Sequence, residues 1–147
     1  MPEAALPRGY ILSFDYGLKR IGVAVGQAMT ATATPLETVR HGPTEPDWSA
    51  IARLVREWRP ALALVGLPLG ADGEATDMSR AARRFGAALG ERFDLPVEYI
   101  DERLTSQAAT ARFIEHRASG ALRRKHADRI DAIAAQIMLE NYLHARR

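Results

Sequence analysis

Three carboxylates stand beside predicted elements of secondary structure, where acids can leave the core and face a ligand. Asp15 ends the apolar run 10–14, Glu102 follows the run 97–101, and Asp131 lies at the start of the last helical pattern. Acids at the ends of separate elements can converge in a fold. Carboxylate oxygens suit Mg²⁺ or Mn²⁺. Without a metal the three charges would repel one another, and at least one of them should have a raised pKa.

Each acid also has an ordinary structural explanation. Asp15 could form an Asx-turn before Gly17. Glu102 could pair with the neighbouring Arg103, and Asp131 could stabilise the first turn of its helix through the macrodipole. That helix also carries an apolar stripe, which predicts that Asp131 points partly toward the sheet. The stripe consists of Ile130, Ile133, Ala134, Ile137 and Met138. Asp128, three residues earlier on the same face, is a second-rank ligand candidate.

Cations are candidates for substrate contacts. Lys19 follows the Gly17 turn and is well placed to touch a phosphate, although an ordinary surface role is open for it and for Arg20. Between residues 112 and 129, six Lys and Arg residues face only two acids. This segment is either a solvated loop or a patch that contacts a phosphate backbone. Its candidate contacts are Arg123, Arg124 and Lys125.

The whole composition is that of an ordinary globular protein. The chain has 147 residues, 47% of them hydrophobic and 26% charged, with a net charge of +2. This length favours one domain over residues 1–147, with residues 1–9 expected to be a disordered lead and not a signal peptide. No apolar run approaches the ~18 residues of a membrane span. The lack of cysteine excludes disulfides and thiolate metal sites and fits a cytoplasmic location.

Alternating and helical patterns predict an α/β protein. Strands are expected at 10–15, 21–26, 32–39, 61–65 and 97–101, and a Gly- and Pro-containing loop at 66–73. Helices are expected at 48–58, from the N-cap Thr76 to about Gly90, from Thr105 to about Glu115, and from about Asp128 to Tyr142. An antiparallel meander followed by βα units predicts a mixed sheet covered by helices. The order matches a ribonuclease H-like fold with five strands arranged 3-2-1-4-5.

Four motifs in the same order resemble the YqgF family of pre-16S rRNA nucleases, also described as Holliday-junction-resolvase-like proteins. They are Phe14-Asp15-Tyr16-Gly17 with the run to Val25, Val65-Gly66-Leu67-Pro68-Leu69 with Asp72-Gly73, Asp101-Glu102-Arg103-Leu104-Thr105-Ser106, and Ile130-Asp131-Ala132-Ile133-Ala134-Ala135. The resemblance extends from about Tyr10 to Tyr142. It implies a ribonuclease H-like fold and a metal-dependent nuclease that matures the 5′ end of small-subunit ribosomal RNA.

By this resemblance Asp15, Glu102 and Asp131 would be the catalytic acids. They would hold one or two Mg²⁺ or Mn²⁺ ions, with Asp15 as the bridging ligand. Pre-rRNA is the favoured substrate and branched DNA the second. Resolution of a Holliday junction would need a symmetric dimer, and no dimer surface is evident, so a monomer is favoured. A non-catalytic RNA-binding assembly factor is a further alternative. An actin-like ATPase is excluded because it needs two such domains.

Overall fold

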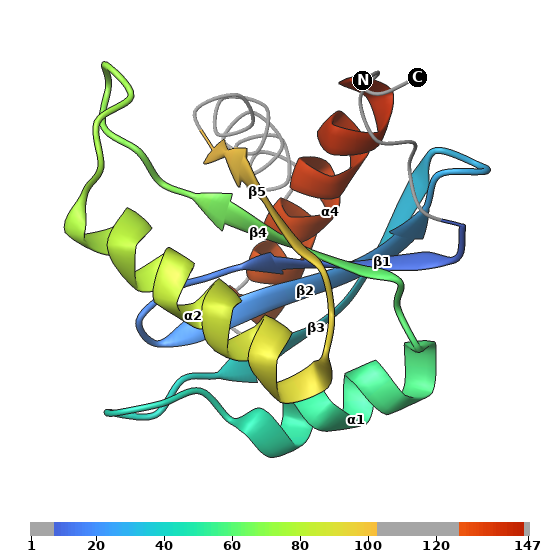
Figure 1. The fold of residues 1–147 in the computed structure, drawn as a ribbon, viewed down its shortest axis with the longest axis horizontal. Coiled ribbons are helices and arrows are strands. Elements are labelled where there is room, and N and C mark those ends of the chain that lie inside the picture. The colour runs from blue at the N-terminus through green and yellow to red at the C-terminus, as the bar shows by residue number, and fades with distance from the viewer. Residues whose placement is uncertain (1–7, 103–126, 146–147) are drawn as a thin grey trace.

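The computed structural model describes residues 8–102 and 127–145, and its core is a mixed five-stranded sheet (Figure 1). The elements in chain order are β1 (Tyr10–Asp15), β2 (Arg20–Gln27), β3 (Thr32–Arg40), α1 (Trp48–Trp58), β4 (Leu62–Leu67), α2 (Asp77–Phe93), β5 (Val97–Asp101) and α4 (Ala127–Ala145). The strands are ordered β3-β2-β1-β4-β5. β1 pairs antiparallel with β2 and parallel with β4, which in turn pairs parallel with β5. The predicted ribonuclease H-like sheet order is therefore confirmed.

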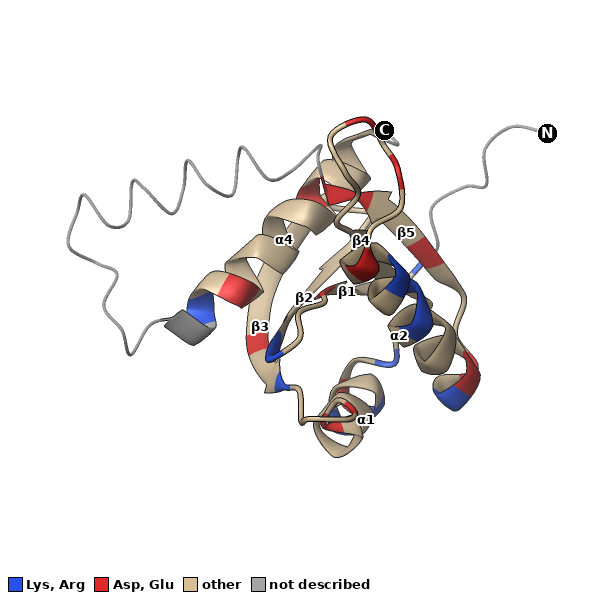
Figure 2. Ribbon diagram, turned by 90° about the vertical axis from the view of Figure 1, so that its left-hand side faces the viewer, with Lys and Arg blue, Asp and Glu red and all other residues tan. Residues whose placement is uncertain are grey.

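The two faces of the sheet are covered by different helices. Helices α1 and α2 pack on one face and α4 on the other (Figures 1 and 2). Side chains alternate along β1: Leu12 and Phe14 join the α1/α2 core, whereas Ile11 joins the cluster beside α4. β4 is buried along its whole length, as a central parallel strand covered on both faces should be.

Local sequence explains where the helices begin and end. Asp47 caps α1 by accepting a hydrogen bond from the Ala50 N–H, and Arg59 ends it in a left-handed conformation. The predicted cap Thr76 forms a reciprocal capping box with Ser79. α2 continues past the predicted end at Gly90 to Phe93, because Asp94 takes the left-handed position and donates its N–H to the Gly90 carbonyl.

Some predicted segments differ from the structure or lie outside it. Gly66 and Leu67 belong to β4 and not to the predicted loop 66–73. The expected lead up to residue 7, the helix from Thr105, and the basic residues Arg123, Arg124 and Lys125 lie outside the described residues. Among the described helices, none combines the length and the apolar character needed to cross a bilayer.

Candidate active site

Asp15 lies at one edge of the sheet, where the parallel strands β1, β4 and β5 all have their carboxyl ends. Ser13, two residues earlier, donates its hydroxyl to the Ala135 carbonyl of α4 at 3.0 Å. Because side chains alternate along a strand, Asp15 shares the α4 face with Ser13. The carboxylate therefore stands at the C-terminal edge of the sheet, on the side that α4 covers.

Glu102 reaches the same place from the end of β5. A methyl group on Gly66 of β4 would lie 2.5 Å from Glu102 Oε1 and 2.6 Å from Met138 Sδ. The missing side chain at Gly66 thus makes room for the Glu102 carboxyl between the sheet and α4. Glu102 is hydrogen-bonded to Asp15, so the first and second predicted acids are brought together.

The environment of Glu102 favours the protonated form of its carboxyl group. Burial, followed by the hydrogen bond to Asp15 and the charges of Asp15 and Asp101, raises the pKa of Glu102 to about 9. Glu102 is therefore protonated at pH 7 and donates to the Asp15 carboxylate. A raised pKa in one acid was expected from the sequence, but its largest cause is burial and not repulsion.

Asp131 sits in the first turns of α4, directly over β2. A methyl group on Gly22 would lie 1.9 Å from the Asp131 carbonyl oxygen, so the helix backbone touches the strand here. Gly22 is the cross-strand partner of Asp15, which makes Asp131 a neighbour of the Asp15 position. The Asp131 side chain forms an ion pair with Arg20, whose Nε lies 2.9 Å from Oδ2.

The three predicted acids thus reach one edge of the sheet but do not form one cluster. Within residues 8–102 and 127–145, no group of three or more His, Asp or Glu side chains is arranged to hold a metal ion. Two acids are joined by a hydrogen bond, and the third is neutralised by a cation. The side chain of Asp128, the second-rank candidate, lies outside the described residues.

Arg20 is the site residue that sequence reasoning missed. The sequence leaves an ordinary surface role open for it, since nothing in the local pattern ties residue 20 to residue 131. The signal that could have found it is alternation: Arg20 is two residues from Gly22, so both face α4. Lys19 is exposed at the turn before β2, and its carbonyl accepts from the His41 N–H at 3.0 Å.

Tyr16 and His41 support the turn beside Asp15. The Nδ1 of His41 lies 2.6 Å from the Gly42 carbonyl, which can only accept, so Nδ1 carries the proton. In the neutral ring Nε2 is then an acceptor, and the Tyr16 hydroxyl donates to it at 2.9 Å. The ring of Tyr16 also packs on Phe85 of α2, with centroids 5.0 Å apart. The residue after Asp15 is therefore fixed by two partners.

The donor set fits a hard divalent cation. Asp15 and Glu102 offer carboxylate oxygens only, which Mg²⁺ and Mn²⁺ prefer. The proton that Glu102 holds at pH 7 marks a position where a cation can replace it, because metal ligands must be deprotonated. Asp131 can join them once its ion pair with Arg20 opens.

The chain is similar to known proteins over nearly its whole length. A family model described as RuvX, Holliday junction resolvase, matches residues 9–145. A protein of Nitrosococcus oceani named "Putative pre-16S rRNA nuclease" is 46% identical over 143 residues, which are 97% of this chain and 90% of the relative. A protein of the same name from Dechloromonas aromatica is 44% identical over 137 residues, covering 93% and 92% of the two chains.

A solved structure of lower sequence identity has the same fold. RuvC from T. thermophilus, in complex with a Holliday junction substrate, superposes with a TM-score of 0.53 at 21% identity over 95% of this chain and 96% of that chain. At this identity the likeness concerns the fold alone. It agrees with the ribonuclease H-like sheet order.

Proposed function

The chain belongs to the RuvX family, and from this membership and the geometry of its acids we propose that it is a metal-dependent endonuclease that matures the 5′ end of pre-16S rRNA. The observation that carries the proposal is the hydrogen-bonded Asp15–Glu102 pair at the carboxyl ends of β1 and β5. Burying a carboxyl pair of this kind costs folding free energy, so folding by itself does not explain its presence. It becomes useful when a cation replaces the proton.

The chain's own residues would divide the work. Asp15 and Glu102 would hold the metal, and Asp131 would complete the ligand set. The missing side chain at Gly66 leaves room for the Glu102 carboxyl, and the missing side chain at Gly22 lets the α4 backbone approach β2 at Asp131. A bound Mg²⁺ or Mn²⁺ would lower the pKa of a water molecule and stabilise the departing oxygen of the phosphodiester. Lys19, with Arg123, Arg124 and Lys125, would hold the substrate backbone without reading its sequence.

The setting of the reaction follows from the proposed substrate. A precursor of ribosomal RNA would place the protein in the cytoplasm and in ribosome biogenesis. Cleavage at one end of an RNA needs one site, so a monomer suffices.

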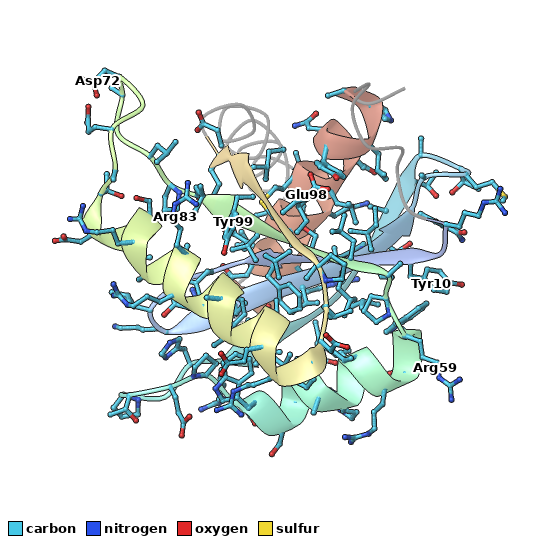
Figure 3. All side chains as sticks on the ribbon, in the orientation of Figure 1. Tyr10, Arg59, Asp72, Arg83, Glu98 and Tyr99 are labelled. Atoms are coloured by element: carbon cyan, nitrogen blue, oxygen red, sulfur yellow. The ribbon has the colours of Figure 1, made fainter. Side chains whose placement is uncertain are left out.

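Substitution of Asp15 tests this function. Asp15→Asn keeps the volume and removes the negative ligand, so cleavage of precursor rRNA with Mg²⁺ or Mn²⁺ should be lost while the circular dichroism spectrum stays unchanged. Asp72→Asn is the matched control, because Asp72 is exposed at the tip of the loop between β4 and α2 (Figure 3). Full activity of Asp15→Asn, with contaminating nuclease excluded, would remove Asp15 from the chemistry.

A second candidate activity is cleavage of four-way DNA junctions. The description of the matching family model favours it. This reaction requires two symmetric cuts and hence a dimer. The same purified protein, given precursor rRNA or a four-way junction with either metal, separates the two. Paired cuts in the junction by a dimer, with the rRNA left intact, would replace the first proposal by the second.

A further inference from the structure

A basic pocket lies beside the acids, at the end of the β2–β3 hairpin. It has a volume of about 340 Å³ and is lined by Lys19, Arg20, Thr38, Arg40 and His41. Figure 2 shows basic segments at the neighbouring ends of β2 and β3, on the side where α4 begins. We call this set of residues the basic pocket.

The strand register forces like charges together in the basic pocket. Arg20 and Arg40 are direct cross-strand partners, so their Cβ atoms are roughly 5 Å apart on the same face. Like charges placed directly opposite each other destabilise a sheet. Lys19 adds a third cation next to them, and its carbonyl is bonded to the N–H of His41. Such an arrangement costs stability unless an anion enters.

Acidic side chains compensate only part of this charge. Arg20 has its ion pair with Asp131. Within residues 8–102 and 127–145, Lys19 and Arg40 form no ion pair with any Asp or Glu. Both side chains are exposed, so they can reach a ligand without leaving a partner.

The position of the basic pocket relates it to the site of cleavage. Arg20 lies two residues along β2 from Gly22, the partner of Asp15. At ~3.4 Å per residue this separation is about 7 Å along the strand, which a neighbouring phosphate of the same nucleic acid strand can span. A strand whose scissile phosphate lies at Asp15 would therefore bring a neighbouring phosphate to the basic pocket.

We propose that the basic pocket binds a backbone phosphate of the nucleic acid substrate, within one or two nucleotides of the cleaved bond, with Arg40 and Lys19 as its main contacts. Arg20 would contact the same phosphate and turn from Asp131 toward it, which frees Asp131 for the metal. The pocket deepens the proposed nuclease function, because it assigns a specific subsite to the substrate of that same site.

Binding without cleavage tests the pocket. Fluorescence anisotropy with a short labelled single-stranded RNA, in EDTA so that no cut occurs, gives the dissociation constant over a salt series. Arg40→Gln should weaken binding about tenfold, as the loss of one charge-assisted hydrogen bond does. It should also lower the slope of log K against log salt by about 0.7.

Two further variants guard the interpretation. Arg56→Gln removes an equally exposed cation from α1 on the opposite face of the sheet, and should leave affinity and slope unchanged. Arg40→Lys keeps the charge and should restore most of the slope, which a merely misfolded pocket would not. Equal losses in Arg40→Gln and Arg56→Gln would overturn the proposal, since the effect would then be net charge alone.

A free anion is distinguished from a nucleic acid phosphate by a second arm. If inorganic phosphate raises the melting temperature of the wild type and not of Arg40→Gln, while RNA affinity is the same in both, the pocket takes a free anion and the proposal is wrong. The nuclease proposal can fail separately. If the wild-type protein never cleaves RNA but Arg40→Gln still weakens RNA binding, the basic pocket stands and the catalytic assignment is wrong. If the wild-type protein cleaves normally and Arg40→Gln binds RNA with unchanged affinity, the nuclease proposal stands and the basic pocket proposal is wrong.

Discussion

The two faces of the sheet are built on different principles. Toward α1 and α2 the strands present large apolar side chains, and the aromatic rings of Trp48 and Phe85 stack with centroids 5.6 Å apart. Toward α4 they present Ser13, Gly22, Gly26 and Gly66, and the helix backbone comes into contact with the strands. The first face is packed through large side chains, whereas the second combines its own apolar cluster with close backbone contact.

Polar contacts divide in the same way. α4 is bonded to the sheet by the Ser13 hydroxyl and by the amide of Gln136, which donates to the Ala33 carbonyl at 3.1 Å. All three predicted acids are on this face or at its edge. Apolar burial therefore stabilises both faces, and the close backbone approach on the α4 face also positions charged groups.

The largest loss of stability is expected on the α1/α2 face. Leu89 of α2 is fully buried in that core, so Leu89→Ala should lower the free energy of unfolding by about 2–5 kcal/mol through lost burial and the cavity left behind. The Mn²⁺ affinity of the protein that remains folded at low temperature should not change. Urea unfolding and a metal titration measure the two quantities. Weaker Mn²⁺ binding by this variant would show that the core on the α1/α2 face also affects the site on the α4 face.

Close packing on the α4 face gives the second prediction. Gly22→Ala should cost roughly 1–3 kcal/mol and also impair cleavage, because the new methyl group meets the Asp131 backbone. Gly86→Ala on α2 is the matched control. There the methyl group meets the hydroxyl and ring edge of the half-buried Tyr99, a side chain near Arg83 and not a backbone (Figure 3), and alanine favours the helix by up to ~1 kcal/mol. Cleavage assays and thermal melts compare the pair; equal effects would show that α4 is not held more tightly than α2.

The raised pKa of Glu102 gives a pH dependence of definite sign. Between its unfolded pKa of about 4.5 and its folded pKa of about 9, the native protein binds more protons than the unfolded chain. The metal-free protein should therefore lose stability as the pH rises through this window. Glu102→Gln, neutral at every pH, should remove this contribution from the slope. Melts in EDTA from pH 5 to pH 9 check it, and parallel slopes in the two proteins would place the Glu102 carboxyl in water.

The smallest effect is expected for the Arg20–Asp131 pair. Its side chains are 50% and 26% exposed, and partly exposed ion pairs contribute about 0–1 kcal/mol. Arg20→Gln should accordingly change the free energy of unfolding by less than about 1 kcal/mol. In EDTA-controlled Mn²⁺ titrations without RNA, the same variant should bind metal more tightly, because Asp131 is no longer neutralised. Weaker metal binding would mean that Arg20 supports the acids and does not compete for them.

Most of the fold could be predicted from the sequence because its signals are local. Alternation and short apolar runs identified the strands, Thr76 marks the start of α2, and the order of elements predicted the sheet order. Asp15 and Glu102 were found because they end or follow predicted strands, and Asp131 because it lies at the start of a predicted helix. Their joint role as metal ligands stays a prediction. The Arg20–Asp131 contact was not predicted, because it depends on how α4 packs on β2.

The orientation of α4 shows the limit of periodicity. The apolar stripe predicted to face the sheet included Ile130 and Ile133, which are only half-buried. Ala132 and Ala135 are buried instead, because small residues are what the contact with Gly22 and Ser13 accepts. Where two backbones touch, size decides the buried face, and hydrophobicity decides it elsewhere.

The hydrogen bond between Ser13 and Ala135 joins residues 122 positions apart in the chain. During synthesis the sheet strands and the two helices on the opposite face emerge first, and α4 is the last described element to leave the ribosome. A nascent chain can thus assemble its apolar half early, while Asp15 and Glu102 still lack the helix that covers them. If the proposed activity is correct, the nascent chain would gain the ability to cut RNA only once α4 has emerged and packed against the sheet.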